Sequence, residues 1–163
     1  MSPPVRIRDA EPGDVALIFS LIVELAEYER APEKVTGTVK LLSQALFGPR
    51  PSAEALIAEI DGEAAGFALF YGTFSTWECR PGIWLEDLYV PETRRRAGVG
   101  GALLAHLAAL TLERGCTRLE WTVLSWNAPA LDFYAKLGAE RMHEWQTHRL
   151  DGEALSRVAR DGS

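Results

Sequence analysis

The sequence predicts one domain over residues 1–163, a mixed α/β sandwich, and three observations lead to this. At 163 residues and 47% hydrophobic content, the chain can bury one core without disulfides or a structural metal. The hydrophobic period changes from helical spacing in residues 12–47 to alternation in residues 54–90. Residues 83–124 have the pattern of strand, helix and strand, the unit that joins parallel strands.

The N-terminal elements are a strand and two helices. Residues 5–9 alternate like a short strand. From Pro12, which suits a first helical turn, apolar residues recur at helical spacing up to about Tyr28. Residues 38–47 have the pattern of a shorter helix that begins at a threonine cap and stops at a Gly-Pro pair. Its cap is Thr36 or Thr38, and the pair is Gly48-Pro49.

The middle of the chain predicts strands. Segments 54–60 and 63–73 are joined by Asp61-Gly62, a strong hairpin signal, and 83–90 is a third strand.

The remaining elements alternate helix and strand. Residues 98–114 predict a long helix that ends at Gly115, and 118–124 predict a strand. A shorter helix follows from Ala128 to about Leu137, ending at Gly138, and 139–150 predict a last strand with a helical tail after it. The predicted order is therefore β-α-α-β-β-β-α-β-α-β.

The net charge and the hydropathy of the chain argue against two classes of protein, those that bind nucleic acid and those that bind or span a membrane. The 17 basic and 23 acidic residues give a net charge of -6, which argues against general affinity for nucleic acid or an anionic membrane. Residues 1–80 hold 12 acidic and 7 basic residues, which suits a cationic partner or simply a solvated acidic surface. No stretch reaches the roughly 18 apolar residues of a membrane span, and the N-terminus lacks an apolar signal, so we expect a cytoplasmic protein.

The cysteines and histidines do not predict a metal site. Cys79 and Cys116 lack a CxxC spacing, so we interpret them as free thiols and expect no metal. The histidines are scattered, and we treat them as structural or surface groups: His106, His143 and His148.

Residues 95–101 form a basic, glycine-rich turn between the predicted strand 83–90 and the predicted helix 98–114. Glycines let backbone amides approach an anion, and the first N–H groups of a helix lack a partner inside the helix. A pyrophosphate therefore fits this turn. The glycine spacing matches neither the dinucleotide fingerprint nor the P-loop. The alternative is a flexible turn with solvent-facing arginines.

This turn resembles the acetyl-CoA pyrophosphate loop of the GNAT superfamily of N-acetyltransferases, with the pattern Arg/Gln-x-x-Gly-x-Gly/Ala at 95–100. Segments 25–29, 85–90 and 120–139 are similar to its spermidine/spermine branch, which includes enzymes acting on diamines and thialysine. The resemblance covers nearly the whole chain and implies the GNAT acyl-CoA N-acyltransferase fold, a mixed central sheet with helices on both faces. Arg96 departs from the pattern, because glycine is often found there.

The resemblance also implies residues that hold acetyl-CoA. The backbone at the end of the strand 83–90 would pair with the pantetheine arm, the turn would hold the pyrophosphate, and Asn127 would begin a helix beside the cosubstrate. Asn127 is equally explained as a plain helix cap followed by a proline. The predicted contacts are Leu88, Tyr89, Val90, Arg95, Arg96, Ala97, Gly98, Val99, Gly100, Gly101, Asn127, Ala128, Pro129 and Ala130.

Amine acetylation sets chemical requirements of its own. A primary alkylamine has a pKa near 10.4, so deprotonation at pH 7 costs roughly 4.6 kcal/mol and the site must accept a proton. Glu86 and Asp87 lie on a strand, where neighbouring side chains point to opposite faces, so one of them faces the cleft. The resemblance gives this role to Glu86, as amine-binding carboxylate and proton acceptor, directly or through water. An edge-strand salt bridge is the alternative.

The leaving CoA thiolate requires a proton donor, and the resemblance gives this role to Tyr134, which is otherwise a core aromatic. Further positions match residues that contact the amine in the diamine branch, although Glu29 could be a solvated helix-end charge and Trp121 a core residue. These positions are Tyr28, Glu29, Glu120, Trp121 and Thr122.

The sequence thus predicts an acetyl-CoA-dependent N-acetyltransferase that transfers the acetyl group directly to a polyamine, a diamine or a thialysine-like amine. The alternatives are another amine (an amino acid, an aminoglycoside-like compound or a peptide) and a non-catalytic acetyl-CoA-binding module. The resemblance implies a homodimer, with residues 144–150 contributing a strand or edge to the contact.

Overall fold

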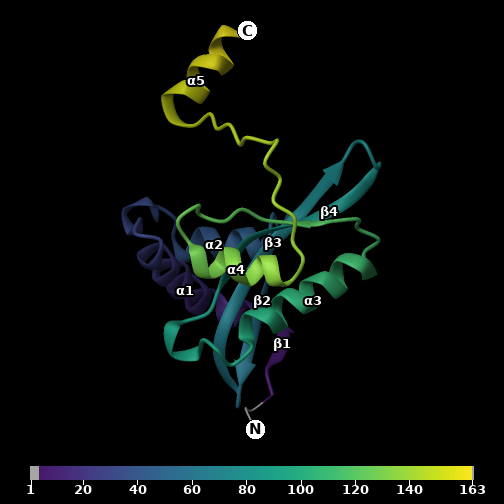
Figure 1. Ribbon diagram of the computed structural model, residues 1–163. Coiled ribbons are helices and arrows are strands. Elements are labelled where there is room, and N and C mark those ends of the chain that lie inside the picture. Colours follow the sequence, from purple (N-terminus) through teal and green to yellow (C-terminus); the bar gives the residue numbers. More distant parts are fainter. Residues whose placement is uncertain (1–3, 163) are drawn as a thin grey trace. The chain divides into compact units, whose positions relative to one another are not determined.

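The computed structural model describes residues 4–162, which form two compact units, one up to Thr122 and one from Val123. The first unit holds a five-stranded sheet in the order β1-β2-β3-β4-β5 (Figure 1). Its strands are β1 (Arg6–Asp9), β2 (Glu54–Ile60), β3 (Glu63–Ser75), β4 (Arg80–Tyr89) and β5 (Leu119–Glu120). Its helices are α1 (Val15–Tyr28), α2 (Val39–Phe47) and α3 (Val99–Glu113).

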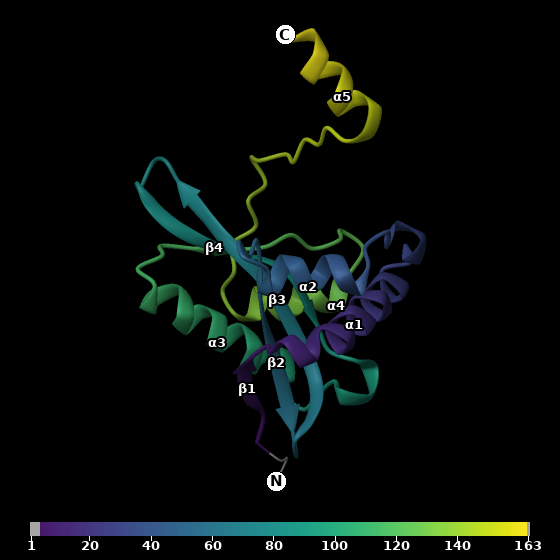
Figure 2. The same cartoon turned by 180° about the vertical axis from the view of Figure 1, so that it is seen from behind.

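Strands β1 to β4 pair antiparallel, and β5 pairs parallel with β4. The turn between β2 and β3 places both Asp61 (φ 53°) and Gly62 (φ 79°) in the left-handed region, as a tight two-residue hairpin turn requires. The crossover from β4 through α3 to β5 makes the predicted parallel unit. In Figures 1 and 2 the β3–β4 hairpin reaches beyond the other strands of the sheet.

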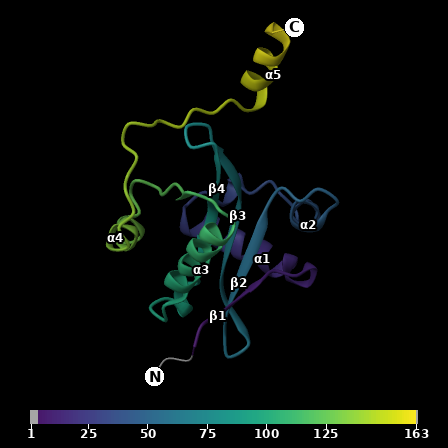
Figure 3. The same ribbon diagram turned by 90° about the vertical axis from the view of Figure 1, so that its right-hand side faces the viewer.

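Helices of the first unit cover both faces of its sheet: α1 and α2 lie on one side and α3 on the other (Figure 3). One core cluster joins Ile18 and Leu21 of α1 to Ile57, Phe67 and Leu69 of the sheet, all at most 8% exposed. The cluster also contains Tyr89, so the end of β4 is anchored toward α1. These packed faces hold the strand on which the candidate site is built.

The predicted helix ends are confirmed. Of the two threonines considered, Thr38 is the cap of α2, its hydroxyl accepting from the Leu41 N–H at 3.2 Å, and α2 stops at Gly48. Helix α3 ends before Gly115, whose φ of 67° only glycine adopts without strain.

The second unit contains α4 (Ala128–Lys136) and α5 (Gly152–Asp161). Asn127 caps α4, its side-chain oxygen accepting from the Ala130 N–H at 3.4 Å, and Pro129 lies in the first turn. Gly138 follows α4 with a φ of 83°, which confirms the predicted stop.

Two predicted strands require correction. The strand over 118–124 is only Leu119–Glu120, and the predicted last strand over 139–150 is wrong because the structure has no strand there. Residues 140–150 contain a single β-branched residue, Thr147, and several charges, so alternation alone does not favour extended pairing. The helical tail after this segment is confirmed as α5.

No helix within residues 4–162 is long and apolar enough to cross a membrane. In the same described part of the chain, no cluster of three His, Cys, Asp or Glu side chains is arranged to hold a metal ion. Cys79 is exposed and Cys116 is buried, both as free thiols, as expected.

Candidate active site

The site begins with an irregularity in β4. Leu85 pairs with Phe70 and Asp87 pairs with Leu69, so Glu86 is an extra residue without a partner on β3. Such a bulge interrupts the alternation of side chains. Asp87 shares the face of Leu69, which belongs to the α1-facing core, and Glu86 bonds to residues of the same face. The expectation that Glu86 and Asp87 point to opposite faces is therefore wrong.

Glu86 is exposed and held by two donors. Its Oε2 accepts from the Trp84 indole Nε1 at 3.0 Å and from the Tyr71 hydroxyl at 3.4 Å. Burial, together with the charge of Glu86, raises the pKa of Tyr71 and keeps its hydroxyl protonated. The two donors fix the carboxylate at the surface of the sheet, where an incoming cation can reach it.

Asp87 is the more buried carboxylate. Burial, together with the negative charges of Glu86 and Glu29, raises its pKa from 3.8 to about 6. Glu29 caps the C-terminal end of α1, and burial raises its pKa as well. Three carboxylates from two elements thus lie within electrostatic reach, an arrangement that a bound cation would stabilise.

β4 is paired on one side only over its second half. The ladder with β5 ends at Trp84, which pairs with Glu120, whereas β4 continues to Tyr89 against β3. Beyond Trp84, no strand within residues 4–162 pairs with this edge of β4. Glu120 is paired with Arg118 at 3.1 Å, and Trp121 and Thr122 continue beyond the end of β5.

The loop after β4 leads into α3 through a tight, strained path. A 3-10 turn over Glu92–Arg94 precedes Arg96, whose φ of 68° lies in the left-handed region. This conformation explains why glycine suits that position, and it makes Arg96 a strained residue. Gly98, at φ 80°, is the N-cap residue that precedes α3.

The start of α3 fits a pyrophosphate. A Cβ added to Gly98 would meet no atom within 4 Å, so space lies open beside the backbone. The Ala102 N–H donates to the Gly98 carbonyl at 3.0 Å, whereas the N–H groups of 99–101 precede the first helical hydrogen bond. Together with the helix dipole, these amides can hold an anion.

Tyr134 lies on α4 in the second unit. Its ring centroid is 5.2 Å from that of Phe133, and burial raises the pKa of its hydroxyl, so the group is protonated at neutral pH. Ala128, Pro129 and Ala130 form the first turn of the same helix. A protonated phenol is the state required of a proton donor.

The acetyltransferase (GNAT) family profile matches residues 20–139. This chain belongs to that family. Thialysine N-epsilon-acetyltransferase from Bos taurus is 39% identical over 166 residues, covering 95% of this chain and 97% of the relative. L-ornithine N5-acetyltransferase from Arabidopsis thaliana is 29% identical, covering 94% and 87%. The structure of an integron cassette protein from the mobile metagenome of V. cholerae has a TM-score of 0.79 at 27% identity and covers 98% of both chains.

The family settles the class of the enzyme and its fold. GNAT acetyltransferases use acetyl-CoA as cosubstrate, and this chain is an N-acetyltransferase with the GNAT fold.

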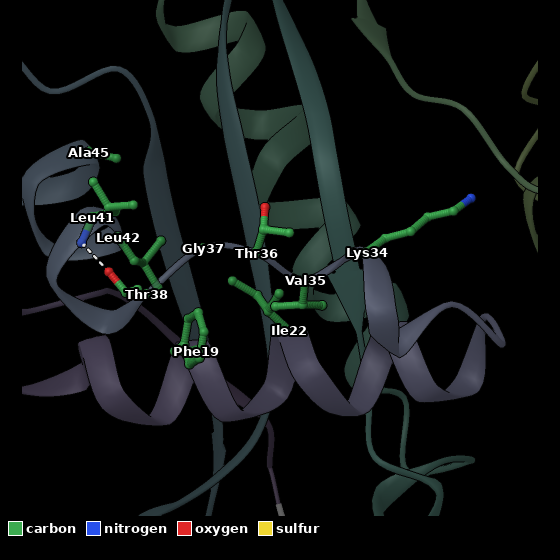
Figure 4. A pocket seen from close by; sticks show the side chains of 10 residues that line it. All are labelled: Phe19, Ile22, Lys34, Val35, Thr36, Gly37, Thr38, Leu41, Leu42 and Ala45. Carbon is green, nitrogen blue, oxygen red and sulfur yellow. Dashed lines mark hydrogen bonds between the residues drawn. The ribbon is translucent and has the colours of Figure 1, made fainter. Parts of the chain in front are cut away.

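A separate pocket of about 440 Å³ lies between α1, residues 34–38 and α2 (Figure 4). Its lining is mostly apolar and includes Phe19, Ile22, Lys34 and Leu42. None of the predicted acetyl-CoA or amine residues lines it. The candidate site is therefore the surface of β4 and its following loop, not this pocket.

Three members of the candidate site were not predicted from the sequence. Trp84 and Tyr71 were not predicted to hold Glu86, and Asp87 was not chosen as the cleft-facing carboxylate. A signal was available: two consecutive acidic residues inside an apolar strand fit a bulge better than regular alternation.

Proposed function

We propose that this GNAT enzyme transfers the acetyl group of acetyl-CoA directly to the primary amine of a small cationic acceptor, a polyamine, a diamine or a thialysine-like amine. The observation that carries the proposal is the group of carboxylates Glu29, Glu86 and Asp87 on the α1 face of the sheet. Relatives named as thialysine and L-ornithine acetyltransferases support the same acceptor class.

Acetyl-CoA would be held mainly by backbone groups. The unpaired edge at the end of β4, including Leu88, Tyr89 and Val90, would pair with the pantetheine arm. The loop 95–101 would hold the pyrophosphate with its amides. The start of α4, Asn127 to Ala130, would also contact the cosubstrate.

The amine would lie among residues from α1, β4 and the β5 region. Its ammonium would be bound by Glu86, with Tyr28, Glu29, Glu120, Trp121 and Thr122 as further contacts. Glu86 would then accept the proton, directly or through water. Because a carboxylate also stabilises the ammonium form, the amine would bind in its charged form. It would lose its proton only as the nitrogen approaches the acetyl carbonyl carbon.

Acetyl transfer would exchange a C–S bond for a C–N bond. The neutral amine nitrogen forms a C–N bond to the acetyl carbonyl carbon, and the C–S bond breaks with its electron pair on sulfur. Tyr134 would protonate that sulfur, and the second proton, which the nitrogen releases as the amide forms, would return to Tyr134 directly or through water. The first amine proton has by then left through Glu86 to solvent. Holding both reactants together supplies much of the acceleration, so no covalent acyl-enzyme is required.

The proposed setting is a cytoplasmic homodimer, with neither nucleic acid nor a membrane as a partner. Residues 139–150, which form no strand in the structure, contain the exposed side chains of Met142 and Trp145. A second copy would bury the exposed apolar side chain of Met142, which supports assembly through this region. Light scattering should give about twice the 18.0 kDa of one chain, and a value near one chain mass would refute the dimer.

The decisive experiment is CoA release with a panel of amines. We expect turnover with diamines, polyamines and thialysine-like amines, and little with neutral or anionic acceptors. Preference for an aminoglycoside or a peptide amine would show that the proposed acceptor class is wrong. Binding of acetyl-CoA with no turnover on any amine would indicate a non-catalytic module.

A further inference from the structure

The side chain of Arg95 contacts the end of β4 and the end of α1. Its Nε donates to the Val90 carbonyl at the end of β4, at 3.1 Å. Its guanidinium carbon lies 4.6 Å from the centroid of the Tyr28 ring, on the last residue of α1. The first arginine of the cofactor loop therefore contacts the helix that ends beside the proposed amine site.

The end of α1 carries an acceptor-side carboxylate. Glu29 directly follows Tyr28, and its N–H still donates to the Leu25 carbonyl at 2.8 Å, so its position follows the last helical turn. The charge of Glu29 acts on Asp87. A contact that holds the last turn of α1 against β4 therefore also fixes the distance between Glu29 and Asp87, two carboxylates of the proposed amine site.

The contact uses properties that lysine lacks. The flat guanidinium can stack on a ring while an N–H in its plane donates to a carbonyl, whereas an ammonium is a point charge without a face. Arg114 makes a comparable pair of contacts elsewhere, with Glu54 at 2.7 Å and with the Phe70 ring at 5.8 Å. It lies at the end of α3, outside the proposed site, and offers a matched control.

We propose that Arg95 is a positioning residue for the amine acceptor. Its side chain holds the last turn of α1, and with it Glu29, against the end of β4, while the phosphates are left to the loop amides. This inference rests on the proposed function for its kinetic consequence, but the structural link between Arg95 and Tyr28 does not depend on which amine is acetylated.

The kinetic test compares Arg95→Lys with Arg114→Lys. We expect Arg95→Lys to raise the KM for the amine about 3- to 10-fold, because the ring contact and the carbonyl hydrogen bond are lost. Its kcat and the calorimetric Kd for CoA should stay within about 2-fold of the parent, since the backbone still holds the phosphates. Arg114→Lys should change neither the KM nor the Kd.

A double-variant cycle tests the partner. Tyr28→Leu removes the ring, and if Arg95 acts through that ring, adding Arg95→Lys to Tyr28→Leu should raise the amine KM by less than it does in the parent. Hydrogen exchange gives a readout that needs no amine: Arg95→Lys should speed exchange in the peptide covering residues 24–31, and Arg114→Lys should not.

Three results would overturn the inference. A weaker CoA Kd with an unchanged amine KM would assign the Arg95 side chain to phosphate and overturn the inference, as would full additivity with Tyr28→Leu or unchanged exchange at 24–31. If the parent acetylates no amine, the proposed function fails, and the exchange experiment alone still decides whether Arg95 holds the end of α1.

Discussion

Replacing Asp87 by Asn should make the protein more stable at neutral pH, although the residue lies in the proposed site. Burial and the charges of Glu86 and Glu29 raise the Asp87 pKa from 3.8 to about 6. A carboxyl group with a raised folded-state pKa favours folding at low pH, and this contribution is lost as the pH rises through the folded pKa. At 1.36 kcal/mol per pKa unit, the charged form costs about 3 kcal/mol of folding stability above pH 6.

The assay is urea unfolding of the parent and Asp87→Asn between pH 4 and pH 7.5. The stability of the variant relative to the parent should increase over this range by up to about 3 kcal/mol, with most of the change between pH 4 and pH 6.

Asp14→Asn is the matched control with the opposite sign. The hydrogen bond from Arg8 to Asp14, at 2.7 Å, lowers the Asp14 pKa, so this variant should lose stability relative to the parent as the pH rises. If the difference in unfolding free energy between Asp87→Asn and the parent were the same at pH 4 and pH 7.5, the charged form of Asp87 would not destabilise the folded protein.

Four further predictions concern the cosubstrate, the chemistry and the loop. A bulky residue in place of Gly98 or Gly100 should raise the Kd for CoA about 10-fold or more by obstructing the backbone; unchanged calorimetric affinity in both variants would contradict the loop placement. Glu86→Gln should lower turnover of cationic amines about 100-fold with CoA affinity preserved, and equal losses in both would instead indicate a structural role. Tyr134→Phe should slow single-turnover acetyl transfer about 10² to 10⁴-fold while CoA affinity holds; a rate within a few-fold of the parent would make Tyr134 a core aromatic. Arg96→Val should cost about 1–2 kcal/mol of unfolding free energy relative to Arg96→Gly, measured by urea unfolding, and equal stabilities would argue against strain at φ 68°.

The parts of the fold that could be predicted are those in which a short stretch of sequence allows only one local structure. Asp61-Gly62 can supply two left-handed residues, and the apolar face of 98–114 followed by Gly115 specifies a helix and its end. The last strand was wrong for the converse reason, because alternation in 139–150 does not provide a neighbouring strand.

The candidate site was less predictable because one residue changes its geometry. Regular alternation would place Glu86 and Asp87 on opposite faces, whereas the pairing of Asp87 with Leu69 shows a bulge at this point. The donors to Glu86 depend on the same register, since Tyr71 comes from a different strand. The strain at Arg96 was visible only as a departure from a glycine-rich pattern.

The bulge in β4 has a consequence for changes in chain length. Removing one residue from a regular strand inverts the faces of every side chain after it. Glu86 lies outside the ladder, so its deletion would let Leu85 and Asp87 pair with Phe70 and Leu69 in regular succession, and the partners of the rest of β4 would stay the same. The sheet can thus gain or lose this carboxylate without repacking its core, which makes position 86 a natural insertion point for a functional group.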